Sequence, residues 1–261
     1  MTSAGYRIFT LVLVVSSIWL SACSRTNPDV ALRRAYDVAM GDGQGSGQKT
    51  THFEAALTLL EDAVELDDPS AEALEFQLIC LVRLGRTDEA LEVCTRLQNL
   101  NGESFILNYL AGKIYYDRGN YKTALAFLEK AHKARPDDEN TNLLRAVAAT
   151  RSDYPDAGTY MEQLLAMTAF KQESDLYNEW AMWLLRNGKP LPALSVLTQG
   201  TAVQNPNIAL YRNIAVIQDA ELKRPEPAWR FYKIYQEVGV GHISEDELKK
   251  VQQRQRQIAS R

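Results

Sequence analysis

The sequence predicts an all-α chain built from repeated helix pairs. From Pro28 onward the apolar residues recur at helical spacing, and no stretch alternates in the way that a strand does. Gly, Asn, Asp and Pro separate the helical segments. The same short pattern also returns every 34 residues, as the pairs Gly85 with Gly119 and Ala90 with Ala124 show. A regular period of this length indicates a repeat architecture.

The first segment of the chain predicts a signal peptide rather than a membrane-spanning helix. After Arg7, the run from Ile8 to Leu20 is almost entirely apolar. A helix needs about 20 residues to span a bilayer, and this run is shorter. A positive residue before the run and small residues after it are typical of a secretory signal. We therefore expect residues 1–22 to be a signal peptide.

The end of this run, Leu20, Ser21, Ala22 and Cys23, resembles the lipobox of bacterial lipoproteins. The resemblance implies cleavage before Cys23, a diacylglycerol on its sulfur and an acyl chain on the new amino terminus. Ser24 follows, where a signal for inner-membrane retention would have aspartate, so the resemblance favours the outer membrane of a Gram-negative bacterium, on its periplasmic face. The alternative is an ordinary secreted protein that is cleaved after Ala22.

Composition and charge argue against a nucleic-acid partner. The chain has 29 Lys and Arg against 33 Asp and Glu, and removal of residues 1–22 takes away only Arg7, which leaves 28 − 33 = −5. This acidic balance gives no support to a nucleic-acid partner. The chain is 46% hydrophobic and 24% charged, as is usual for a folded protein of this length.

Two cysteines, Cys80 and Cys94, remain for disulfide chemistry, which an oxidising periplasm permits. Their positions on the two helices of one repeat are offset by about six residues, or roughly 9 Å at 1.5 Å per residue. This offset exceeds the Cα–Cα span of a disulfide, which stays below about 7 Å. We therefore predict that they are not bridged.

The most regular unit, residues 105–138, resembles the tetratricopeptide repeat, a helix pair of 34 residues. The resemblance implies a right-handed α-solenoid of about six helix pairs followed by a C-terminal capping helix. Its matching positions are Gly112, Tyr115, Gly119, Tyr121, Ala124, Leu128, Ala131 and Pro136. This register places a tether at 23–27, repeats at about 28–70, 71–104, 105–138, 139–173, 174–207 and 208–241, and a polar capping helix at 242–261.

Several positions of the repeat require a particular type of residue for local structural reasons. Gly112 and Ala124 are small, so the paired helices can approach closely, and Gly119 follows the first helix where a left-handed residue is wanted. The next repeat carries Asp153 in place of this turn glycine. In the last helix, Ser244 and Glu247 form the pattern of a capping box.

We find no pattern that predicts catalysis. The stretch 43–50 is rich in glycine, but Gln48 separates the glycine from Lys49, so it does not match a phosphate-binding loop, and we interpret it as a flexible insertion. The three histidines have no carboxylate or cysteine at ligand spacing. We therefore expect no enzyme activity, no catalytic residue, no metal ligand, no cofactor and no small-molecule substrate.

The resemblance also implies where a partner protein binds. First helices line the concave face of such a solenoid, and that face is the usual binding surface. Its middle is apolar and aromatic, which suits an amphipathic helix or an extended apolar peptide, although any of these side chains could instead be core between repeats. The predicted partner-binding residues are Ile79, Val82, Tyr109, Lys113, Tyr116, Leu143, Val147, Asn178, Met182, Leu185 and Arg212.

A lipobox followed by six such repeats resembles the pilotin and assembly lipoproteins of type IV and tight-adherence pili. In those families the implied role is to bind a secretin subunit, or another pilus or secretion component, and to help it insert or oligomerise in the outer membrane. Two alternatives stay open. One is a periplasmic scaffold for exopolysaccharide or cell-envelope machinery, and the other is a regulator of peptidoglycan enzymes.

Overall fold

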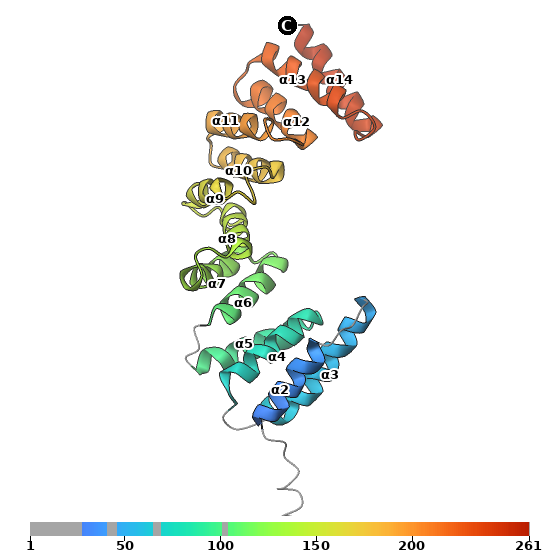
Figure 1. The fold of residues 1–261 in the computed structure, drawn as a ribbon. Coiled ribbons are helices and arrows are strands. Elements are labelled where there is room, and N and C mark those ends of the chain that lie inside the picture. Colours follow the sequence, from blue (N-terminus) through green and yellow to red (C-terminus); the bar gives the residue numbers. More distant parts are fainter. Residues whose placement is uncertain (1–27, 41–45, 65–68, 101–103, 261) are drawn as a thin grey trace, which may run out of the picture. The chain divides into compact units, whose positions relative to one another are not determined.

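The computed structural model describes residues 28–40, 46–64, 69–100 and 104–260. Within these ranges every regular element is a helix (Figure 1), which confirms the predicted fold class of consecutive tetratricopeptide-like helix pairs followed by a final helix. No helix in them is both long and apolar enough to cross a bilayer. The elements are α2 (Pro28–Ala39), α3 (Ser46–Val64), α4 (Ala71–Arg83), α5 (Thr87–Asn99), α6 (Phe105–Asp117), α7 (Tyr121–Ala134), α8 (Glu139–Arg151), α9 (Ala157–Ala166), α10 (Ser174–Arg186), α11 (Pro190–Gly200), α12 (Ile208–Val216), the π-helix η1 (Ile217–Glu221), α13 (Pro225–Val238) and α14 (Glu245–Ala259).

The predicted signal peptide, Cys23 and the tether 23–27 lie outside the described residues, as does most of the glycine-rich stretch that begins at Gly43. The chain divides into two compact units, Met1–Ala111 and Gly112–Arg261, and the boundary lies within α6.

In the first unit α2 packs on α3, α3 on α4, and α4 on α5. Small alanines on α2, such as Ala35, are completely buried, so the helices approach closely. The ring of Tyr36 stacks on that of Phe76 with 3.8 Å between their centroids, which ties α2 to α4. The apolar faces of α4 and α5 supply Leu74, Leu78 and Leu97, each at most 1% exposed.

In the second unit each helix from α7 to α14 packs on the next one along the chain, with η1 contacting α12 and α13, and α8 also touches α10, which in turn touches α12. The first helices of successive pairs are therefore neighbours, as a tetratricopeptide arrangement requires. Close approach depends on Gly112 in α6: a Cβ there would lie 2.8 Å from Cγ of Leu128 in α7. Tyr115 and Phe127 stack beside this contact, with ring centroids 5.6 Å apart.

The turns within four helix pairs share one geometry. Gly85, Gly119 and Gly188 have φ values of 73°, 74° and 68°. At each turn the N–H of the glycine donates to the carbonyl of the residue three positions earlier in the chain. The N–H of the residue after the glycine donates to the carbonyl five positions before that residue. This is the Schellman arrangement that favours glycine. Asp153, which replaces the glycine in one repeat, takes the same left-handed conformation at φ 52° and pairs with Arg186 at 3.1 Å.

The last helix, α14, begins with the cap that the sequence predicts. The hydroxyl of Ser244 accepts a hydrogen bond from the backbone N–H of Glu247 at 3.3 Å. Val251 and Ile258 are buried on the side that packs against α13. The rest of the helix is mostly polar, so α14 covers the last pair with a face that water solvates.

Candidate functional site

The predicted partner-binding residues fall into the two units of the chain. Ile79, Val82 and Tyr109 belong to the first unit, and the others belong to the second. In the first unit these three side chains are half-buried, and the ring of Tyr109 stacks on that of Phe105 with centroids 5.7 Å apart. Each of the three therefore presents only part of its surface.

In the second unit, the predicted partner-binding residues lie on α6, α8, α10 and α12, which are the first helices of their pairs. We call this set of residues the first-helix face. Its members are Lys113, Tyr116, Leu143, Val147, Asn178, Met182, Leu185 and Arg212.

Four apolar members of the first-helix face are half-buried: Tyr116, Leu143, Met182 and Leu185. Tyr116 and Leu143 pack against a buried cluster formed by α8, α9 and α10. Val147 departs from the prediction, because it is only 6% exposed and belongs to that core cluster. The reason is that α8 is enclosed by α7, α9 and α10, so the valine in its middle has no open side.

The polar members of the face already have partners within the chain. Oδ1 of Asn178 accepts a hydrogen bond from Nδ2 of Asn213 at 2.7 Å. The ammonium of Lys113 pairs with Asp117 at 2.6 Å. Nε of Arg212 lies 2.8 Å from Oε1 of Glu247, which comes from α14. The two ion pairs involve exposed groups, and such pairs contribute about 0–1 kcal/mol, so a partner could displace them at little cost.

Sequence reasoning missed an arginine that organises the edge of this face. Arg151, in the last turn of α8, lies over the rings of Tyr116 and Tyr121, at 5.7 and 5.4 Å from their centroids, and its Nε is 3.3 Å from Oε1 of Glu179. Partial burial opposes its positive charge, but the hydrogen bonds to Glu179 and Tyr121 outweigh this and raise the pKa of Arg151. The only sequence signal was a basic residue in the last turn of a helix.

Cys80 and Cys94 are both buried free thiols. Burial raises the pKa of each thiol to about 11. The thiolate is the nucleophilic and metal-binding form of cysteine, so near neutral pH these two groups are inert. Within the described ranges no three His, Cys, Asp or Glu side chains gather closely enough to hold a metal ion.

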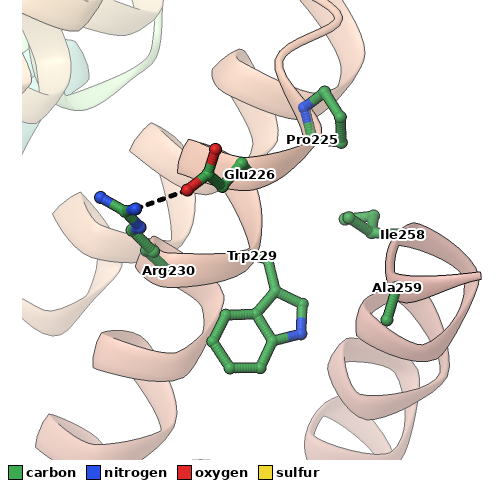
Figure 2. Close-up of a pocket in the computed structure, with 6 residues that line it drawn as sticks. All are labelled: Pro225, Glu226, Trp229, Arg230, Ile258 and Ala259. Carbon is green, nitrogen blue, oxygen red and sulfur yellow. Dashed lines mark hydrogen bonds and ion pairs between the residues drawn. The ribbon is translucent and has the colours of Figure 1, made fainter. Parts of the chain in front are cut away.

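A cavity that the sequence did not predict lies between the start of α13 and the end of α14 (Figure 2). Its volume is about 420 Å³, and Pro225, Trp229, Ile258 and Ala259 give it apolar walls. Trp229 is 38% exposed, and Glu226 forms an ion pair with Arg230 on the rim at 2.5 Å. No pattern in the sequence of α13 or α14 indicates this opening.

Comparison with known proteins agrees with this architecture. A family model described as anaphase-promoting complex, cyclosome, subunit 3 (ANAPC3) matches residues 49–147. A comparison with curated proteins found no match.

Several solved structures are similar in fold. One is YrrB, described as a TPR protein with an unusual peptide-binding site, with a TM-score of 0.56 and 19% identity over 73% of this chain and 93% of that one. Another, pilF of Pseudomonas aeruginosa, has a TM-score of 0.53 and 15% identity over 86% of this chain and 99% of that one. A third, a point mutant of MamA, has a TM-score of 0.55 and 18% identity over 66% and 94%. With its helix pairs, shared turns and neighbouring first helices, the chain therefore has the helix-pair fold of tetratricopeptide-repeat proteins.

Proposed function

We propose that this protein is exported, anchored by lipid at Cys23 to the periplasmic side of the outer membrane, and binds an apolar segment of a partner protein on the first-helix face. We propose further that the role is pilotin-like and that the partner is a secretin subunit. One observation carries the binding proposal: partly exposed apolar side chains recur on successive first helices.

Apolar side chains recur on successive helices of the first-helix face. Leu143 on α8 is followed by Met182 and Leu185 on α10, and α8 and α10 are in contact. Val216, at the end of α12, is 38% exposed and extends the series. A surface that keeps apolar side chains on neighbouring elements is typical of a protein-binding site. Methionine and leucine adapt to differing apolar partners, so an amphipathic helix or extended strand would fit.

A protein with this fold supports a peptide segment as the ligand. YrrB is described as having a peptide-binding site, and the pilF structure aligns over nearly its whole length. At 15–19% identity the likeness concerns the fold alone. The fold suggests that a peptide should be the first kind of partner to test. A peptide segment of a pilus secretin is the first candidate, because Ser24 after the lipobox favours the outer membrane.

Lipid anchoring would raise the effective affinity for a membrane-bound client. Each buried methylene adds about 0.8 kcal/mol to membrane binding, and several acyl chains together make the attachment stable. Only residues 23–27 separate the anchor from α2. The anchor holds the protein at the membrane that also contains the client, where modest affinity is sufficient.

The test is capture of the secretin by a surface variant. In Met182→Gln/Leu185→Gln the face becomes polar, and we expect at least about tenfold weaker capture, which corresponds to the loss of about 1.4 kcal/mol. The matched control is Leu191→Gln, because Leu191 is 54% exposed and lies on the second helix α11. Circular dichroism must show that both variants are folded. Equal capture by the wild type and the double variant would refute the binding proposal.

The pilotin role needs a separate experiment. Deletion of the gene should abolish secretin multimers in the outer membrane, and the wild-type protein should restore them. A Cys23→Ala variant should bind secretin in solution but fail to restore the multimers. If multimers form normally in the deletion strain, the pilotin role is excluded. The capture assay then still tests whether the first-helix face binds a partner protein.

A further inference from the structure

A buried arginine lies beside a small cavity in the second unit. Arg145, in the middle of α8, is only 5% exposed although it carries a full positive charge. The cavity has a volume of about 220 Å³, and Arg145, His132, Asn142, Tyr160 and Gln163 are among the residues that line it. These residues come from α7, α8 and α9, and none of them belongs to the first-helix face.

The guanidinium of Arg145 has fewer hydrogen bonds than its burial requires. It lies over the ring of Tyr160, 4.3 Å from the centroid, and its Nη2 donates to Oε1 of Gln163 at 3.1 Å. Its Nε faces Oε1 of Glu129 at 4.0 Å, and both of these buried atoms lack a hydrogen-bond partner. A guanidinium has five N–H donors, and a buried polar group without a partner is costly. The cavity therefore borders an arginine whose buried Nε has no hydrogen-bond partner.

Charge decides which acceptor fits. Glu129 already balances the charge of Arg145, and a further carboxylate, Asp137, lies on the cavity wall. Burial, and then the neighbouring Arg145, lower the pKa of His132, so its imidazole is neutral near physiological pH. A carboxylate ligand would add an unbalanced negative charge to a poorly solvated place, which is unfavourable. A neutral group is favoured.

The neutral group needs both a donor and an acceptor. Arg145 offers N–H donors, while Nδ1 of His132 is buried without a partner and, on a neutral ring, can accept a hydrogen bond. A primary carboxamide carries one carbonyl oxygen and an NH₂ group, which match these two needs. Leu164, Met167 and the ring of Tyr160 give the cavity apolar walls that suit a methylene stem.

Size limits the ligand to one side chain. The cavity is smaller than the roughly 300–1,000 Å³ of pockets that hold whole small molecules. We propose that it binds the carboxamide side chain of an asparagine or glutamine from a partner segment, with the amide oxygen on the guanidinium of Arg145 and the amide NH₂ directed to His132. This subsite goes beyond the proposed function, because it rests on neither lipid anchoring nor a secretin.

The experiment uses the purified, isotope-labelled protein and three blocked amino acids as probes: the N-acetyl, N-methylamide derivatives of glutamine, glutamate and norleucine. Titrations followed by NMR report on the Arg145 side chain and the Tyr160 ring. We expect saturable shifts with the glutamine probe near neutral pH. The other two probes should bind at least about tenfold more weakly, because norleucine loses the hydrogen bond to Arg145 and glutamate adds an unbalanced negative charge.

Variants assign the binding to this cavity. Arg145→Met keeps the length of the side chain and should lower the affinity for the glutamine probe by at least about tenfold. The control Arg186→Met, in α10, removes an exposed arginine and should leave the affinity unchanged. The proposal is overturned by the absence of saturable shifts, by a glutamate probe that binds as tightly, or by unchanged affinity in folded Arg145→Met. Because the three probes are compared on the unchanged protein, an Arg145→Met variant that fails to fold leaves the test intact.

Discussion

Asp219 and Arg254 face each other across the junction between η1 and α14, joined by two hydrogen bonds. Nε and Nη2 of Arg254 lie 2.5 and 2.7 Å from the two carboxylate oxygens of Asp219. The Asp219 side chain is 8% exposed, and Arg254 is 33% exposed. This bidentate pair fixes α14 to the last repeat, because two parallel hydrogen bonds restrain both the position and the orientation of the arginine.

Loss of this pair should loosen α14. We expect Asp219→Ala to lower the free energy of unfolding by about 1.5–3 kcal/mol, since hydrogen bonds to charged groups are lost from a mostly buried site. Glu226→Ala removes one partner of a solvent-exposed pair and should cost at most about 1 kcal/mol. Urea unfolding monitored by circular dichroism compares the two. Equal unfolding midpoints for the two variants would contradict the role of Asp219.

Gly112 should tolerate no larger residue. A Cβ at this position would lie 2.8 Å from Cγ of Leu128, so Gly112→Ala forces α6 and α7 apart. Overpacking of this kind costs about 1–3 kcal/mol, which we expect to see as a lower thermal midpoint. Ala126→Ser on the exposed side of α7 serves as the control and should change little. A Gly112→Ala variant as stable as the wild type would show that these helices can separate without penalty.

The left-handed turn at Gly119 predicts a graded response. Its φ of 74° is strained for any residue with a Cβ, at a cost of roughly 1–2 kcal/mol. Gly119→Ala should therefore destabilise the protein by about this amount, and Gly119→Asn should cost less, because asparagine tolerates this conformation better. Chemical denaturation of the two variants provides the measurement. The opposite order of stability would mean that the turn conformation is not what selects glycine here.

Turns and caps were predictable from the sequence because they depend on contacts within a few residues. The glycines at 85, 119 and 188 and the cap at Ser244 each carry a local signal, and Asp153 was recognisable as a replacement for a turn glycine. The helix-pair fold class followed from the 34-residue period of the same signals. The turn geometry recurs in four of the described helix pairs, so one regular unit was enough to set the register.

Burial within the site was less predictable because it depends on residues far apart in the sequence. Val147 occupies a position that the register places on the open face, yet α10 and α9 cover it. Arg145 stands in a helix rich in alanine, and nothing local shows that its guanidinium is buried over the ring of Tyr160. The π-helix η1 likewise has no sequence signal that the periodicity could reveal.

The two buried thiols should be unreactive in the native protein. Burial raises the pKa of Cys80 and Cys94 to about 11, so the thiolate fraction near neutral pH is on the order of 10⁻⁴. We expect iodoacetamide to leave both unlabelled under native conditions and to label both in urea, as mass spectrometry of the peptides will report. As the pH rises toward 11, labelling should accelerate. Rapid native labelling at neutral pH would show that the helices of this pair open readily.

The most direct test of the central claim is a photocrosslink in the living cell. A benzoylphenylalanine at position 182, on the first-helix face, is expected to give a covalent adduct with the secretin subunit, identified by mass spectrometry. The same probe at position 191, on the exposed side of α11, is expected to give none. If position 182 forms no adduct with a secretin, or if position 191 forms the same adduct in equal yield, then the first-helix face is not the secretin-binding site.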